Sequence, residues 1–330
     1  MHSVTGGILL CRTVIGLNDT LQQLARCWDY AIEHQRILIV DPLPASFGVP
    51  VLRYLVPFVG SGCVVWAGSA HLYRALNRYD NVVPPDLAGQ VDQSDRCQYR
   101  GIRRLWKRRS TTRATFNFKT RHDAELIIHA RGGGGERSIT TLSRMAFRPE
   151  FARKIGAALS GLKSEYLAVH IRNTDMQTDY RRFFESIRPQ LEGQRLLICS
   201  DDIQCKNYAK KYFRKTEVIE STQTPDTNGA ALHGNPEFDQ DAHTQAAFTD
   251  LMALAMAKEI LVTETDRSRL SGFSRLALLL HQDRQLCDQL LTSATGADRV
   301  RLGFSEHPTR EAPNADLVRP DLNLLPKPRS

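Results

Sequence analysis

The chain has 330 residues, 42% of them hydrophobic and 24% charged, which is ordinary for a folded globular protein and excludes wholesale disorder. This length predicts two domains. The net charge of +8, from 44 basic and 36 acidic residues, favours anionic partners such as nucleotides, phosphorylated lipids, membrane faces or nucleic acid.

Short apolar runs alternate with amphipathic stretches along the chain. Such runs suit strands that are buried on both faces of a sheet. They cover residues 7–10, 37–40, 126–129, 166–171, 196–199, 217–219 and 260–263. Their alternation with helical segments predicts βαβ units and parallel sheets.

Three intervening segments have the apolar spacing or composition of helices, and they cover residues 20–34, 244–258 and 271–283. In the first segment one stripe is expected to face a core, and it consists of Leu21, Leu24, Ala25, Trp28 and Ile32.

A domain boundary is expected near residues 157–165, which gives each half of the chain its own α/β sheet. The predicted units are residues 1–160 and residues 161–305. They are followed by a tail, residues 306–330, that is rich in proline and polar residues and is expected to be extended or disordered. Residues 43–121 have a less regular pattern than the rest.

The stretch YLAVHIRNTDMQTDY brings His170, Arg172 and Asp175 to the carboxyl end of a buried strand, the edge at which open α/β sheets bind ligands. His170 and Arg172 are two residues apart and share a face of the strand. Arginine suits bidentate recognition of phosphate. The cluster therefore indicates an anion site, with ordinary surface ion pairs as the alternative.

The stretch LLICSDDIQCKNYAKKYF contains a strand that ends in Ser200, Asp201 and Asp202, where a helix begins. Serine or aspartate at such a position can cap the helix. A carboxylate there can also accept hydrogen bonds from a ribose or from the two adjacent N–H groups of guanine. Metal binding is a third interpretation, but no third ligand suggests itself.

The stretch ILVTETDRSRLSGFSRLALLL predicts a strand, a polar loop and a helix that opens at Ser271 and Gly272. Free N–H groups at a helix N-terminus beside a hydroxyl form a good anion site. An ordinary N-cap is the alternative interpretation.

Other signals are weaker. The chain has no P-loop, dinucleotide GxGxxG pattern, HExxH, GxSxG or paired CxxC. A flexible turn or a substrate loop is predicted for four consecutive glycines, Gly132, Gly133, Gly134 and Gly135.

The expected location is cytoplasmic. The seven cysteines are odd in number and irregularly spaced, which fits reduced thiols better than a disulfide framework. No secretory signal or membrane span is predicted. A basic run begins at Arg100 and ends at Arg113; it is either a solvated face or a contact with an anion or the inner membrane face.

Taken in order, the motifs resemble those of the superfamily that contains bacterial nodulation α1,6-fucosyltransferases, core α1,6-fucosyltransferases of N-glycans and α1,2-fucosyltransferases. Residues 12–41 look like its N-terminal strand, glycine turn, helix and strand. HIRNTD at 170–175 is similar to its HxRxxD-type first motif. CSDD at 199–202, followed by Leu232 and His233, resembles the second motif, and residues 248–280 with SGFSR resemble the third.

The resemblance implies a GT-B fold, in which two Rossmann-like domains with parallel sheets face a cleft. Residues 1–160 would form the acceptor-side domain, and residues 161–305 would bind the nucleotide sugar. The implied reaction is an inverting transfer of fucose from GDP-fucose to a hydroxyl of a glycan, with no required metal or other cofactor.

The resemblance also implies site residues. Arg172 would bind the donor diphosphate, and Arg172 and Asp175 are the predicted catalytic residues. The predicted donor-binding residues are His170, Arg172, Asn173, Ser200, Asp201, Asp202, His233, Ser271, Gly272 and Arg275. A turn facing the cleft would consist of Gly16, Asn18 and Asp19.

Several alternatives stay open. The general base could be Asp175, Asp179 or Glu264. Many relatives carry a second arginine where this chain has Asn173, so another sugar nucleotide is an alternative donor. A non-transferase nucleotide-binding α/β enzyme is a further alternative. The expected partners are a GDP-sugar donor and an oligosaccharide or glycolipid acceptor, and no recognisable module supports nucleic-acid binding.

Overall fold

The computed structural model describes residues 7–12, 16–41, 53–57, 64–66, 70–91, 114–163, 165–230, 232 and 237–292. The chain divides into two compact units. Unit 1 comprises Met1–Met145 and Ala294–Ser330, and unit 2 comprises Ala146–Ser293. The basic run at 100–113, the tail at 306–330 and His233 lie outside the described residues.

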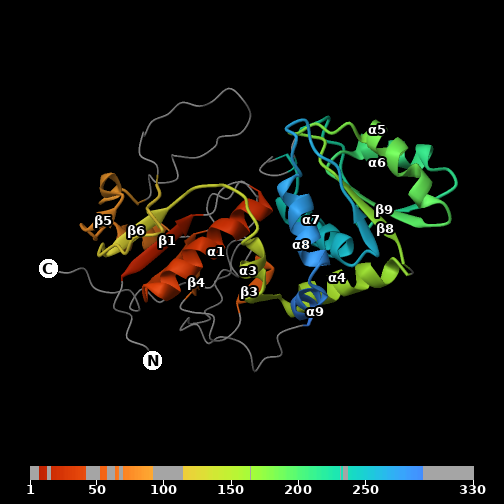
Figure 1. Ribbon diagram of the computed structural model, residues 1–330. Coiled ribbons are helices and arrows are strands. Elements are labelled where there is room, and N and C mark those ends of the chain that lie inside the picture. Colours follow the sequence, from red (N-terminus) through yellow and green to blue (C-terminus); the bar gives the residue numbers. More distant parts are fainter. Residues whose placement is uncertain are drawn as a thin grey trace. The chain divides into compact units, whose positions relative to one another are not determined.

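Unit 1 is built on a five-stranded sheet in the order β4-β2-β1-β6-β5, with parallel pairing throughout (Figure 1). Its strands are β1 (Ile8–Arg12), β2 (Ile37–Asp41), β4 (Val64–Trp66), β5 (Val82–Val83) and β6 (Leu126–His129). A further strand, β3 (Leu55–Pro57), lies outside this sheet. The helical elements are α1 (Leu17–Glu33), α2 (Ala70–Leu76), the short 3-10 helix η2 (Pro85–Leu87) and α3 (Ser138–Leu142).

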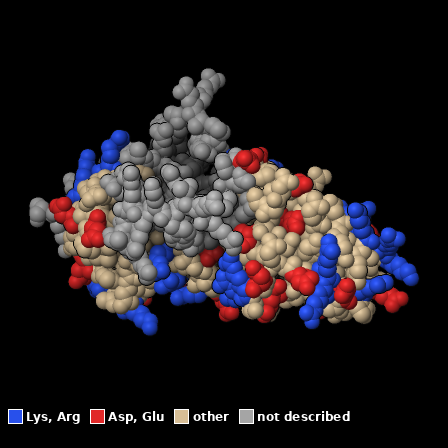
Figure 2. Space-filling model, turned by 90° about the horizontal axis from the view of Figure 1, so that it is seen from above, with Lys and Arg blue, Asp and Glu red and all other residues tan. Residues whose placement is uncertain are grey.

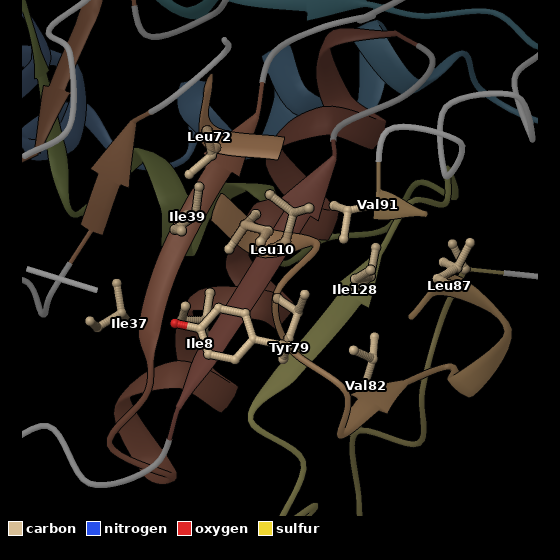
Figure 3. Close-up of a cluster of buried hydrophobic side chains, with 13 residues drawn as sticks. Ile8, Leu10, Ile37, Ile39, Leu72, Tyr79, Val82, Leu87, Val91 and Ile128 are labelled. Atoms are coloured by element: carbon tan, nitrogen blue, oxygen red, sulfur yellow. The ribbon is translucent and has the colours of Figure 1, made fainter. Parts of the chain in front are cut away.

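One hydrophobic cluster of unit 1 lies on one face of this sheet. Alternate residues of the central strands point to the same side because successive strand residues alternate between the faces. Figure 3 shows Ile8 and Leu10 of β1 beside Ile39 of β2 and Ile128 of β6. Residues from α2 and the segment after it close this cluster, among them Leu72, Leu76, Tyr79, Val82, Leu87 and Val91.

Helix α1 contacts β1 and β2 and buries most of its predicted stripe. Ile32 departs from the prediction, because 49% of this residue is exposed. Tyr30 and Ala31, in the same last turn of α1, are buried.

Unit 2 contains a four-stranded sheet in the order β10-β9-β8-β11, again with parallel pairing. The strands are β8 (Leu167–Ile171), β9 (Arg195–Ser200), β10 (Glu217–Ile219) and β11 (Glu259–Leu261). The helical elements are α4 (Pro149–Gly161), α5 (Tyr180–Ile187), the 3-10 helix η4 (Arg188–Leu191), α6 (Ile203–Tyr212), α7 (Gln240–Ala255), α8 (Gly272–His281) and α9 (Arg284–Leu291). The short strand β7 (Met145–Phe147) spans the point at which the units divide.

Two helical layers enclose the sheet of unit 2. Helices α5 and α6 cover one face, where Phe184 and Cys205 pack against Val169 and Ile198. Helices α7 and α8 lie on the other face (Figure 1), and α7 contacts both β8 and β9. Helix α4, at whose end the predicted boundary falls, contacts α7 and α9.

The seven apolar runs predicted as strands are confirmed as β1, β2, β6, β8, β9, β10 and β11. The prediction gave no strands within residues 43–121, where β3, β4 and β5 are only two or three residues long. Strands that short leave almost no alternation in the sequence.

Five cysteines in the described part of the chain are buried and have free thiols: Cys11, Cys27, Cys199, Cys205 and Cys287. No helix among the described residues is long and apolar enough to cross a bilayer.

Candidate functional site

The candidate site of unit 2 begins where β8 and β9 end. The two strands are parallel neighbours, and their register pairs His170 with Cys199 and Ile171 with Ser200. The residues that follow both strands therefore emerge side by side at the carboxyl edge of the sheet, where α/β folds bind ligands.

Arg172, the first residue after β8, is held between two carboxylates. Its Nε and Nη2 atoms contact Asp175 Oδ1 at 2.8 and 2.5 Å, and its Nη1 atom lies 2.8 Å from Asp201 Oδ2. The Asp175 side chain is 43% exposed, whereas that of Asp201 is only 8% exposed. Arg172 thus has one buried and one accessible anionic partner.

Asp201 joins the loop after β9 to the loop after β8. Its Oδ1 accepts a hydrogen bond from the backbone N–H of Asn173 at 2.8 Å, and its Oδ2 accepts one from Thr174 Oγ1 at 2.5 Å. Together with Arg172, these contacts use both oxygens of a buried carboxylate. Asp201 therefore fixes the backbone that carries Arg172 as well as its guanidinium.

Asp202 is also engaged within the protein. Its Oδ1 accepts the backbone N–H of Gln204 at 2.8 Å, which caps α6, and its Oδ2 accepts Asn173 Nδ2 at 2.7 Å. Ser200 Oγ accepts the backbone N–H of Asp202 at 3.1 Å. The helix-capping interpretation is thus confirmed for Asp202, while nucleoside recognition by these residues stays a prediction.

Both polar atoms of the Asn173 side chain are bonded within the protein. Its Nδ2 donates to Asp202, and its Oδ1 accepts the backbone N–H of Thr178 at 3.0 Å. Thr178 Oγ1 donates to the carbonyl of Arg172 at 2.6 Å. The loop after β8 is therefore closed on itself by short polar contacts.

His170, the residue of β8 two before Arg172, lies against the start of α8. Its Nδ1 atom is 2.7 Å from Ser274 Oγ, which in turn is 2.9 Å from Ser271 Oγ. Burial lowers the pKa of His170 to about 4, against a smaller opposing effect of Asp201. The imidazole is therefore neutral near pH 7, and the two hydroxyls orient it.

Ser271 caps α8, because its Oγ accepts the backbone N–H of Ser274 at 3.0 Å. Gly272 is the first residue of this helix, and Arg275 lies half-buried in its first turn. The cap interpretation of Ser271 is confirmed. Anion binding at the same helix start is a separate role that stays a prediction.

The remaining base candidates differ in their surroundings. Asp179 caps α5 by accepting the backbone N–H of Arg182 at 3.2 Å. Glu264 is exposed in the loop that follows β11. Asp175, the third candidate, contacts Arg172 through its Oδ1 atom.

In unit 1, the predicted turn and the glycine run meet. Gly16 is the N-cap residue of α1. Asn18 Nδ2 donates to the carbonyl of Gly135 at 3.2 Å, and Asp19 Oδ1 accepts the backbone N–H of Gly133 at 3.1 Å. The glycines are therefore attached to the start of α1, which favours a fixed loop over a flexible turn.

Close approach explains the glycines of this loop. Gly133 has a φ of +134°, a conformation that L side chains rarely adopt. A Cβ atom on Gly135 would lie 2.8 Å from the side chain of Gln22. A side chain at Gly133 would strain the backbone, and one at Gly135 would require the end of the Gln22 side chain to move.

A buried histidine contacts Gln23, a residue that holds the glycine loop. His129, the last residue of β6, has Nε2 2.9 Å from Gln23 Oε1 and Nδ1 3.0 Å from Thr115 Oγ1. Gln23 Nε2 donates to the carbonyl of Gly133 at 2.5 Å. Because Gln23 Oε1 is then the acceptor, His129 carries its proton on Nε2, and burial lowers its pKa to about 3.

The sequence prediction missed several residues that complete these sites. Ser274 orients His170, Thr174 and Thr178 close the loop after β8, and Gln22 and Gln23 hold the glycine loop. Ser274 carried one usable signal, since it stands three residues after a predicted cap. No group of three or more His, Cys, Asp or Glu side chains among the described residues is arranged to hold a metal ion.

No protein-family model and no curated protein sequence matches the chain. Among solved structures, it is similar to NodZ alpha-1,6-fucosyltransferase co-crystallized with GDP, at 16% identity and a TM-score of 0.50, over 84% of this chain and 93% of that chain. Fucosyltransferase NodZ from Bradyrhizobium gives the same identity and TM-score, over 84% and 94% of the two chains. POFUT1 in complex with GDP aligns at 13% identity and a TM-score of 0.47, over 83% and 94%.

The likeness to NodZ covers most of both chains and shows a shared fold. The predicted α/β class, with two Rossmann-like parallel sheets of the GT-B type, is therefore confirmed. The resemblance to the fucosyltransferase superfamily is confirmed at the level of fold.

Proposed function

We propose that the chain is a glycosyltransferase that moves fucose from GDP-fucose to a hydroxyl of an oligosaccharide or glycolipid, with inversion and without a required metal. The observation that carries the proposal is the position of Arg172, oriented by Asp201 at the carboxyl edge of a parallel sheet. The shared fold with NodZ, which was crystallised with GDP, supports a guanosine diphosphate as the nucleotide.

The chemistry needs positive charge where the diphosphate leaves. As the bond to the sugar breaks, charge develops on the phosphate oxygens, and fixed donors aimed at that charge lower the barrier. Arg172 supplies a planar guanidinium suited to two phosphate oxygens. The start of α8 at Ser271 and Gly272 supplies backbone N–H groups and the positive end of a helix dipole.

Arg172 must exchange a partner to bind a diphosphate. Asp175 is the partner that can leave, because its side chain is 43% exposed, whereas Asp201 is buried and, besides Arg172, accepts two hydrogen bonds, from the backbone N–H of Asn173 and from Thr174 Oγ1. We infer that Asp201 stays as the orienting carboxylate. Released from Arg172, Asp175 is then available to accept the proton of the acceptor hydroxyl.

His170 adds a neutral group beside the same edge. Its lowered pKa keeps it uncharged near pH 7, so it contributes hydrogen bonding rather than charge. The hydroxyls of Ser274 and Ser271 fix its ring, which makes it a pre-oriented contact for the donor.

Unit 1 is the proposed acceptor-side unit, with Gly16, Asn18 and Asp19 as the turn that serves the reaction. Asn18 and Asp19 hold the glycine loop, so a change at either residue would alter the loop as well as the turn. His233 is proposed to complete the donor pocket, on the resemblance of Leu232 and His233 to the second motif alone.

A different sugar nucleotide is the second candidate, and Asn173 favours it. An asparagine side chain is neutral, so it brings no second positive charge to the diphosphate, and here it is bonded to Asp202 and Thr178. This edge therefore differs in charge from that of relatives with two arginines.

The experiment is a donor-turnover assay with purified full-length protein. Release of GDP from GDP-fucose is measured with a panel of oligosaccharide and glycolipid acceptors, with and without EDTA, beside UDP-sugars. Turnover of GDP-fucose that survives EDTA and gives a product of inverted anomeric configuration supports the proposal. Turnover of a UDP-sugar alone would overturn the assignment of GDP-fucose as the donor. Loss of activity with EDTA would overturn the proposal that no metal is required.

A further inference from the structure

Helices α5 and α6 pack through a row of aromatic side chains that runs from the core of unit 2 to its surface. The rings of Phe184 and Tyr208 are 6.2 Å apart and those of Tyr208 and Tyr212 are 5.7 Å apart, each pair with an interplanar angle of 16°. Phe184 is fully buried, whereas both tyrosines are half-buried. The outer end of the row therefore has apolar rings with polar tips at the surface.

Two arginines cover these tyrosines. The guanidinium of Arg181 lies 5.0 Å from the ring centre of Tyr208, and that of Arg188 lies 5.7 Å from the ring centre of Tyr212. Cation–π contacts of this kind hold a flexible charged side chain in place. The two charges are thus fixed above the aromatic row.

The same face carries more positive than negative charge. Six exposed cations on or beside α5 and α6 form no ion pair with any described residue: Arg181, Arg182, Arg188, Lys211, Arg214 and Lys215. Three carboxylates on this face likewise lack a cationic partner there: Asp179, Glu185 and Glu192. Six against three leaves an excess of three positive charges, and Figure 2 shows Lys and Arg side chains projecting around this end of unit 2.

Fixed cations beside partly buried aromatic rings suit binding to a broad anionic surface that has an apolar layer beneath it. Arginine and tyrosine side chains place apolar stems and rings at the level of lipid headgroups while their polar ends remain in water. Lys and Arg side chains near an anionic membrane are attracted to its surface charge. We propose that the face formed by α5 and α6 is a docking surface for an anionic lipid membrane.

A nucleic acid fits this face less well. Single strands bind by stacking their bases on accessible aromatic faces. Here the rings of Tyr208 and Tyr212 stack on each other and are covered by Arg181 and Arg188, which leaves no open platform. Phosphates along a strand would find charge on this face but no partner for the bases.

Membrane docking extends the proposed function by bringing the enzyme to a lipid-linked acceptor, but its evidence is separate. The α5 and α6 face lies on the opposite side of the sheet from α7 and α8 (Figure 1), and none of the six cations counted on it is a predicted donor residue. Vesicle binding requires neither GDP nor turnover. A failure of the docking surface and a failure of the transferase assignment are therefore distinguishable.

The experiment is co-sedimentation of the full chain with vesicles of phosphatidylcholine, with or without about 30 mol% phosphatidylglycerol. We expect binding only to the anionic vesicles and a fall in binding as salt rises from about 50 to about 200 mM. The triple variant Arg182→Gln, Lys211→Gln and Lys215→Gln removes three cations whose side chains make no hydrogen bond to a described residue. We expect its partition coefficient to fall at least about tenfold.

The matched control removes three exposed cations elsewhere in unit 2, through Arg153→Gln, Lys154→Gln and Lys258→Gln. The control variant should bind the anionic vesicles nearly as well as the unmodified chain. Equal losses in both triple variants, undiminished binding by the α5–α6 variant, or equal binding to neutral vesicles would each overturn the proposal. Tighter binding to single-stranded DNA than to the anionic vesicles would overturn it in favour of a nucleic-acid surface.

Discussion

One carboxylate, Asp201, fixes both the guanidinium of Arg172 and the backbone that follows it. The Nη1 atom of Arg172 lies 2.8 Å from Asp201 Oδ2, and the backbone N–H of Asn173 lies at the same distance from Oδ1. Such double attachment sets the direction of an arginine before any ligand arrives. In the proposed enzyme, pre-orientation of this kind lowers the entropic cost of binding the diphosphate.

Substituting Asp201→Asn should separate the orientation of Arg172 from its charge. Asparagine keeps one acceptor oxygen but places an NH₂ group beside donors, so the free energy of unfolding should fall by about 1–3 kcal/mol. Affinity for GDP should fall about tenfold or more. Chemical denaturation and calorimetric titration measure the two effects.

Asp175→Asn is the matched control for that prediction. Asp175 is 43% exposed and contacts the same arginine, so its loss should leave the stability within about 0.5 kcal/mol. The Asp175→Asn substitution should lower the turnover rate instead. An Asp201→Asn protein with unchanged GDP affinity would contradict the orienting role.

Ser274→Ala should free the ring of His170. The hydroxyl of Ser274 lies 2.7 Å from His170 Nδ1, and that of Ser271 lies 3.5 Å from the same atom. Nitrogen NMR of the imidazole should report a single tautomer in the unmodified chain and a mixture in the variant. GDP affinity should fall by about tenfold, the loss of one good hydrogen bond.

Ser274→Cys keeps a weak polar group of similar size and should restore part of that affinity. A single tautomer that survives in Ser274→Ala would show that another group orients the ring.

The stability of the chain should fall in mild acid, and His129 should account for part of the loss. Its pKa is about 3 when folded, against about 6.5 in an unfolded chain. Between these values the unfolded state binds the proton and the folded state does not, so the contribution of His129 to stability declines as the pH falls below about 6.5 and is constant above pH 7. His170, with a folded pKa of about 4, acts in the same direction.

Urea denaturation at pH 7 and pH 5 tests this linkage. His129 alone should cost about 2 kcal/mol between those two values, from about 1.4 kcal/mol per pH unit. His129→Gln keeps an amide that can bond to Gln23 and Thr115 and should decline less steeply by about that amount. If the two proteins lost the same unfolding free energy between pH 7 and pH 5, folding would not lower the pKa of His129 as described.

Gly133→Ala should destabilise unit 1. The φ of +134° at Gly133 is strained for alanine and should cost about 1–3 kcal/mol. Gly156→Ala, inside α4 with open space around the added methyl group, should instead stabilise the chain by up to about 1 kcal/mol. Thermal denaturation measures the stability of both variants. An unchanged stability of Gly133→Ala would indicate that the loop can rearrange.

The parallel sheets were predictable from the sequence because their strands are continuous apolar runs. Leu126–His129 and Leu167–Ile171 are buried at every described position, a pattern that local sequence carries by itself. The two- and three-residue strands β3, β4 and β5 were not predictable, since they exist only through pairing with the rest of a sheet.

The site was predictable in its location but not in its contacts. The position of Arg172 after a buried strand was enough to place it at the sheet edge. That Asp201, rather than a phosphate, would hold it depends on the register between β8 and β9, which the sequence does not state. Likewise, nothing near Gly132 in the sequence indicated that α1, more than a hundred residues earlier, anchors this loop.

The central claim is tested most directly by calorimetric titration of the full chain with GDP, without added metal, beside UDP and NAD. We predict selective binding of GDP that is lost in Arg172→Ala and largely lost in Arg172→Lys, because a point charge cannot replace the planar guanidinium. Arg153→Ala, an exposed arginine on α4, should leave the affinity unchanged. GDP binding that survives Arg172→Ala, or no binding of GDP at all, would contradict the assignment of this edge as the donor site.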